Sequence, residues 1–286
     1  MPEHPSTTSP LPTLVLMPPQ TPRNDAPSPT PLPPPAGAKA PIEKAHGNLS
    51  KHPKNQFSLP KLRLEIRDLN HAGTQSFLTS VIASDALQTS VQSVLSLLYH
   101  SPNSTTTTVP PTRSITLIMR SMEGVAYTTG TELDSDHKEI HFSLDYLHSS
   151  VAASRMTDEI MGVLTHEVVH CYQYNGFGTC PGGLIEGIAD WVRLNANLSP
   201  PHWKKEYSGN WDAGYQHTGY FLEYLEQRFG IGMIRRMNEK LRIERYEEKR
   251  FWTELCGRPV HQLWQDYGKA VQQENKKAED DECVLV

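Results

Sequence analysis

Two histidines four residues apart, with a glutamate directly after the first, are the residues in this sequence best suited to chemistry. They lie in the run Thr165-His166-Glu167-Val168-Val169-His170, inside a stretch whose apolar spacing predicts a helix. A four-residue step on an α-helix adds only about 40° of rotation and about 6 Å of rise, so both imidazoles point the same way and can bind one metal ion. Glu167 is rotated by about 100° from His166, which places its carboxylate beside the metal, as a base acting on water requires.

A second predicted helix supplies a carboxylate that can complete the site. It follows a turn-rich stretch over residues 178–183, and Glu186 stands in its otherwise apolar first turn, where a bare carboxylate would be costly to bury. A metal ion would offset that cost, so we predict Glu186 as the third ligand, with Asp190 as the alternative. If Glu186 binds the metal, Asp190 lies one turn on and can accept the free N–H of a ligating imidazole. Two His and one Glu leave a zinc position open, which is typical of a catalytic site, and predict one Zn²⁺ per chain.

The segment around these residues resembles the plant basic secretory protein family, zinc metallopeptidases of the gluzincin type with relatives in fungi and bacteria. The resemblance covers roughly residues 60–270, which favours one domain over two. It is carried by His166-Glu167-Val168-Val169-His170, Tyr172-Gln173-Tyr174-Asn175-Gly176, the run from Pro181 to Arg193, Trp211-Asp212-Ala213-Gly214-Tyr215, Phe221-Leu222-Glu223-Tyr224, Phe251-Trp252-Thr253-Glu254-Leu255 and Leu263-Trp264.

This resemblance implies that the protein hydrolyses peptide bonds by a zinc-activated water, with Glu167 as general base. Such an enzyme also needs a donor for the oxyanion; Tyr215 is the candidate and His217 the second, although Tyr215 could equally pack against Trp211. The usual arrangement of the fold implies that the strand over residues 139–144 edges the cleft and pairs with an extended peptide or protein substrate. The alternative is a zinc-binding protein that holds peptides without turnover.

The elements around the motif predict an α+β domain. Apolar and charged residues alternate near residues 62–66 and 115–119, and again over 139–144, which predicts three strands; helical spacing begins at Asp85. After Ser150 the pattern is mostly helical as far as about residue 272. We therefore predict a zincin-like domain over residues 59–272, with a small N-terminal mixed sheet and helices, an HExxH active-site helix and a mostly helical C-terminal half.

Both ends of the chain differ from this body in composition. Of the 23 prolines, 16 lie in residues 1–60, and we predict that residues 1–58 form a disordered spacer. Its segment Pro31-Leu32-Pro33-Pro34-Pro35 could bind an SH3 or WW domain, and an interaction protein built around this tail is a further alternative. Residues 273–286 are predicted to be a flexible acidic tail. Its last four residues, beginning at Cys283, match a C-a-a-X prenylation signal, although the acidic residues before it argue against a membrane anchor.

Charge and hydropathy exclude several classes of function. The net charge is −5, so no basic surplus exists to neutralise the phosphates of a nucleic acid. No apolar run approaches the roughly 20 residues of a membrane span, and the N-terminal residues do not match a secretory signal. The four cysteines are too few for a disulfide framework. We therefore expect an intracellular, cytoplasmic protein, in contrast to the basic and secreted character that the family name describes.

Overall fold

The computed structural model describes residues 56–284 of the chain. Residues 1–55 of the Pro-rich stretch predicted over residues 1–58 lie outside the described residues. Residues 285 and 286, the end of the motif that begins at Cys283, also lie outside them. None of the helices in the described part combines the length and the apolar character needed to cross a bilayer.

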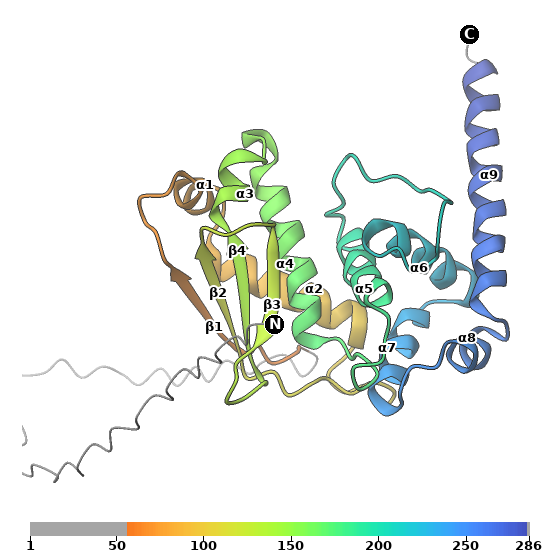
Figure 1. Cartoon of the computed structure of the whole chain (residues 1–286), viewed down its shortest axis with the longest axis horizontal. Helices are drawn as coiled ribbons and strands as arrows, with labels where there is room; N and C mark the ends of the chain where they lie inside the picture. Colours follow the sequence, from red (N-terminus) through yellow and green to blue (C-terminus); the bar gives the residue numbers. More distant parts are fainter. Residues whose placement is uncertain (1–55, 285–286) are drawn as a thin grey trace, which may run out of the picture. The chain divides into compact units, whose positions relative to one another are not determined.

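Alternating apolar residues build a small mixed sheet in the first part of the described chain (Figure 1). Its order is β1-β2-β4-β3; β1 pairs with β2 and β2 with β4 in parallel, whereas β3 is antiparallel to β4. Every second residue of β2 is fully buried, as at Ile115, Leu117 and Met119, and these side chains form the core face of the sheet. The strands are Lys61–Ile66 (β1), Ser114–Arg120 (β2), Ala126–Gly130 (β3) and His137–Ser143 (β4).

The strand β3 was not predicted, and it corrects the expected position of the cleft edge. A turn in which Thr131 N donates to His137 O and His137 N donates to Asp134 O folds β3 back against β4. β4 therefore has a partner on each side, β2 and β3. The prediction that the strand over residues 139–144 edges the cleft is wrong: β3 is the outermost strand on that side of the sheet.

Helices account for most of the remaining described chain, so the architecture is α+β, as predicted. The helix α4 contacts β3 and β4 on one side and α5 on the other, and Figure 1 shows it between the sheet and the later helices. The last helix continues to Val284, past residue 272, where the sequence predicted the domain to end. The helices are Ala72–Ser80 (α1), Ala83–Tyr99 (α2), Leu144–Ser149 (α3), Met156–Tyr172 (α4), Gly182–Asn195 (α5), Tyr215–Phe229 (α6), Met233–Ile243 (α7), Glu248–Cys256 (α8) and Val260–Val284 (α9).

A buried hydrogen-bond network fixes the end of α4. The last carbonyls of a helix lack partners within the helix, and Tyr99 of α2 donates its hydroxyl to the Tyr172 carbonyl. Asn238 of α7 donates to the Tyr99 hydroxyl over 3.0 Å and accepts from the backbone N–H of Tyr174 over 2.9 Å. Because Tyr99 and Asn238 are almost fully buried, this network ties α4 rigidly to α2 and α7.

Glycines allow α5 and α6 to approach each other closely. A Cβ atom added at Gly187 of α5 would lie 2.3 Å from Cγ2 of Thr218 on α6, and one at Gly183 would lie 1.8 Å from the Asp212 carbonyl oxygen. The Thr218 hydroxyl in turn donates to Trp211 O over 2.8 Å and accepts from Gly214 N over 2.9 Å. The start of α6 is therefore positioned by its contact with α5.

We expect Gly187→Ala to lower the free energy of unfolding by up to about 2 kcal/mol, measured by urea denaturation. Overpacking of this kind costs about 1–3 kcal/mol, more than the roughly 1 kcal/mol that Ala gains over Gly in a helix. The matched control is Gly182→Ala in the same helix, because nothing lies within 4 Å of the added Cβ there. Equal stability of the two variants would contradict the close α5–α6 packing.

Candidate metal centre

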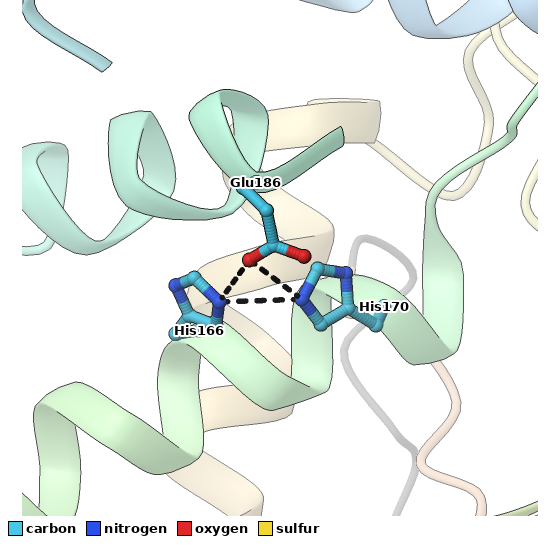
Figure 2. A group of neighbouring side chains, drawn as sticks. All are labelled: His166, His170 and Glu186. Atoms are coloured by element: carbon cyan, nitrogen blue, oxygen red, sulfur yellow. Dashed lines mark hydrogen bonds and ion pairs between the residues drawn. The ribbon is translucent and has the colours of Figure 1, made fainter. Parts of the chain in front are cut away.

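The two histidines project from one face of α4, and Glu186 of α5 points at both of them (Figure 2). His166 Nε2 lies 3.2 Å from His170 Nε2 and 3.0 Å from Glu186 Oε2, and His170 Nε2 lies 3.7 Å from the same carboxylate oxygen. Ligand atoms placed 2.0–2.2 Å from a tetrahedral zinc ion would lie about 3.3–3.6 Å from one another. The three distances differ from this range by only a few tenths of an ångström, so small shifts would let the three side chains hold one metal ion.

Asp190 orients the first of these imidazoles. Its Oδ1 accepts a hydrogen bond of 2.6 Å from His166 Nδ1, and the aspartate is only 2% exposed. A proton held on Nδ1 leaves the lone pair of Nε2 directed at the other two ligand atoms. Of the two carboxylates that the sequence offered as third ligand, Glu186 therefore lies at the metal position and Asp190 lies behind His166.

The charges of the site are mutually dependent. Burial lowers the pKa of the His166 imidazole, but the Asp190 and Glu186 carboxylates outweigh this effect and raise the pKa to about 9. Burial raises the pKa of the Glu186 carboxyl, but its hydrogen bonds with His166 and His170 outweigh this effect and hold the pKa far below its usual range. The pocket thus stabilises a positive charge beside the Glu186 carboxylate, and a bound cation would replace the proton on His166 Nε2.

Glu167 points from α4 toward β3, where a threonine holds its carboxylate. Thr128 donates its hydroxyl to Glu167 Oε2 over 2.7 Å and also lies 3.0 Å from the Glu167 carbonyl oxygen. Glu167 is 6% exposed, so this contact fixes the carboxylate next to the metal ligands rather than in bulk solvent. Thr128 was not predicted from the sequence; the strand-forming run Tyr127-Thr128-Thr129 was the available signal.

A cavity of about 880 Å³ brings the predicted metal ligands and their neighbours together. It is bordered by β3 on one side and by α4 and α5 on the other, so the β3 edge and the candidate metal centre share one space. The predicted residues that line it are His166, Glu167, His170, Glu186, Asp190 and Tyr215.

The structure separates the two candidate oxyanion donors. The Tyr215 ring lies 6.2 Å from the His166 ring, between centroids, and Tyr215 is 57% exposed within the cavity. Negative charge on Glu186, and then burial, raise the pKa of the Tyr215 hydroxyl, so it remains a donor. His217 does not line this cavity; its ring packs on Trp264, with centroids 5.1 Å apart.

An unusual backbone turn brings Tyr215 to the cavity. Gly214 has a φ of 87° and Tyr215 itself has a φ of 47°, a left-handed conformation that is rare for a tyrosine. Trp211, the alternative packing partner of Tyr215, instead lies against Trp252, with ring centroids 5.1 Å apart. The strain of a left-handed tyrosine is consistent with a functional role for this side chain.

Comparison with protein families shows which family the chain belongs to. Residues 59–267 match the model of the BSP family, described as a peptidase of plants and bacteria. Because the match spans most of the chain, the protein belongs to this family, the basic secretory proteins whose motifs the sequence resembles. Comparisons with curated proteins and with solved structures found no significant match.

Asp190→Asn is expected to weaken metal binding by about 10–100-fold, the usual effect of losing the partner of a ligating histidine. The amide can offer Nδ2 in place of the carboxylate oxygen, so the orientation of His166 is no longer fixed. Competition with a chromophoric chelator measures the affinity, with Asp158→Asn as control because Asp158 is an exposed residue of the same helix. Unchanged affinity in Asp190→Asn would contradict the orienting role.

Proposed function

We propose that the chain is a zinc-dependent peptidase with a zincin-like active site of the gluzincin type. The observation that carries the proposal is the convergence of His166, His170 and Glu186 on one point, beside Glu167, in a cavity bordered by β3. Two imidazoles and one carboxylate suit zinc better than calcium or magnesium, which prefer oxygen ligands only. Three protein ligands also match the pattern of catalytic rather than structural zinc sites.

When bound, zinc would polarise the scissile carbonyl and increase the acidity of the attacking water. Glu167 would accept a proton from that water and pass it to the leaving amine. Thr128 holds Oε2 of this glutamate, which leaves the other carboxylate oxygen for the proton transfer. Tyr215 would donate its hydroxyl to the oxyanion of the tetrahedral intermediate.

The outer edge of β3 would bind the substrate backbone. Ala126, Tyr127 and Thr128 line the cavity, and β3 is the last strand of the sheet on that side. An extended peptide can add to such an edge through main-chain hydrogen bonds. This arrangement would place the peptide across the cavity from the α4 ligands. β3 would then have the role predicted from the sequence for residues 139–144.

Metal content and peptide cleavage, measured together, test this function. The purified chain should contain about one zinc ion, cleave a peptide library, lose this activity with a chelator and regain it when zinc is added back. Zinc without cleavage would favour the second candidate, a zinc-binding protein that holds peptides without turnover. Cleavage that survives complete removal of metal would contradict the proposal.

A further inference from the structure

The cavity continues beyond the metal centre, along the first half of α4. Val163 and Glu159 lie one and two turns before His166, and Arg193 lies two turns after Glu186 on α5. All three line the same cavity. Because Val163 lies one helical turn before the candidate ligand His166, a substrate residue adjacent to the scissile bond would place its side chain here.

The charged residues in this part of the cavity neutralise each other. Arg193 Nη2 donates to Glu159 Oε2 over 3.1 Å, and Arg193 Nε donates to the Leu198 carbonyl over 3.0 Å. The Arg193 side chain is 9% exposed and the Glu159 side chain is 14% exposed. Gly162 makes room for the guanidinium, because a Cβ there would lie 2.5 Å from Arg193 Nε. Both charges thus have built-in partners, and a charged substrate side chain would be buried here without one.

Two aromatic side chains, Trp203 and Tyr146, also line the cavity. The Arg193 guanidinium lies 5.3 Å from the centroid of Trp203, which lines the cavity from the loop between α5 and α6. Tyr146 lines it from α3 and donates its hydroxyl to Glu159 over 2.9 Å. Burial, and then the charge of Glu159, raise the pKa of Tyr146 to about 12, so this hydroxyl is neutral. The cavity here presents two uncharged rings and the aliphatic Val163, and Pro200 and His202, from the same loop as Trp203, also line the cavity.

Contacts on both sides fix the loop that carries Trp203. Tyr220 of α6 packs edge-on against the Trp203 ring, with centroids 6.5 Å apart. Further along the loop, the Tyr207 ring packs on Trp264 of α9, with centroids 5.0 Å apart, and occupies the space where Gly268 lacks a side chain. The Trp203 ring is therefore held in place before any substrate binds, which lowers the entropic cost of binding.

We propose that this part of the cavity, lined by Tyr146, Glu159, Val163, Arg193 and Trp203, is a subsite for an aromatic side chain of the substrate, and that Trp203 determines this specificity. The inference rests on the proposed peptidase function. A flat aromatic ring can stack on Trp203 and Tyr146 without separating the Glu159–Arg193 pair. Gln173 and Asn175, which follow the candidate ligand His170 and so lie in the opposite direction along the chain from Val163 and Glu159, also line the cavity, so the aromatic preference applies to one side of the scissile bond only.

Binding of uncleaved peptides tests the subsite. The full chain with Glu167→Gln, loaded with zinc, is titrated by calorimetry with blocked hexapeptides of alanine in which a single Phe, Asp or Lys is moved through each position. At one position, Phe should improve binding at least about tenfold over Ala, as expected for burial of a phenyl ring, whereas Asp and Lys should not. Adding Trp203→Ala should reduce this advantage to about twofold, and Trp203→Phe should keep most of it.

Phe177→Ala is the control, because Phe177 is an exposed aromatic residue that does not line the cavity; the advantage of Phe should persist in it. Equal binding of all peptides, a preference for Asp or Lys, or a Phe advantage that survives Trp203→Ala would each overturn the subsite. Cleavage by the wild-type chain separates the two proposals. Active enzyme without an aromatic preference refutes the subsite alone, whereas a Trp203-dependent preference without any cleavage refutes the peptidase function alone.

Discussion

The Glu167→Gln variant is expected to keep its metal and to lose about 10²–10⁴-fold in kcat, the usual contribution of a general base. Glutamine has the same shape, and its amide oxygen can still accept the hydrogen bond from Thr128 that now reaches Glu167 Oε2. It cannot take a proton from water. Steady-state cleavage of a fluorogenic peptide, together with metal content by mass spectrometry, measures the two properties on the same sample.

The control for Glu167→Gln is Asp158→Asn, which makes the same carboxylate-to-amide change on an exposed position of α4. It should retain wild-type kcat. If Glu167→Gln retains wild-type kcat, Glu167 is not the base, and another group would have to accept the proton. If it loses the metal as well as the activity, the carboxylate acts on the metal site rather than on water.

The His170→Ala variant is expected to lose zinc binding and, with it, the stabilisation that zinc gives to the folded chain. A ligand present at 100 times its Kd stabilises the native state by about 2.7 kcal/mol, which corresponds to a rise in Tm of about 5–10 °C for a domain of this size. The wild-type chain should show this rise when zinc is added. His170→Ala should show none, because only His166 and Glu186 would remain as ligands.

Scanning calorimetry with and without zinc measures this difference without reference to peptidase activity. The matched control is His261→Ala, because His261 is an exposed histidine on α9. This control should show the same rise in Tm as the wild-type chain. A rise of equal size in His170→Ala would mean that zinc binds elsewhere.

The local spacing of residues was sufficient to predict the candidate metal centre. His166 and His170 share a helix face because four residues complete little more than one helical turn, and the same rule places Asp190 next to Glu186. One helix supplies the two imidazoles and the next supplies the two carboxylates. A periodic pattern of this kind is visible in the sequence without any knowledge of the tertiary fold.

The contacts that surround the centre depend on tertiary packing and could not be predicted in this way. Thr128 meets Glu167 only because β3 folds back on β4, and β3 is too short for its alternation to stand out. Because β3 pairs with β4 after this turn, the edge of the sheet is formed by β3 rather than by residues 139–144. Trp203 lies in a loop without periodicity, and Arg193 pairs with Glu159 across two helices, so neither contact leaves a local signal.

The most direct test of the metal centre is the position of anomalous scattering in crystals of the zinc-loaded chain, recorded above and below the zinc absorption edge. We predict one peak about 2.0–2.2 Å from each of three atoms, His166 Nε2, His170 Nε2 and a Glu186 carboxylate oxygen. A zinc-loaded crystal with no peak at these atoms, or with its peak held by other side chains, would contradict the account.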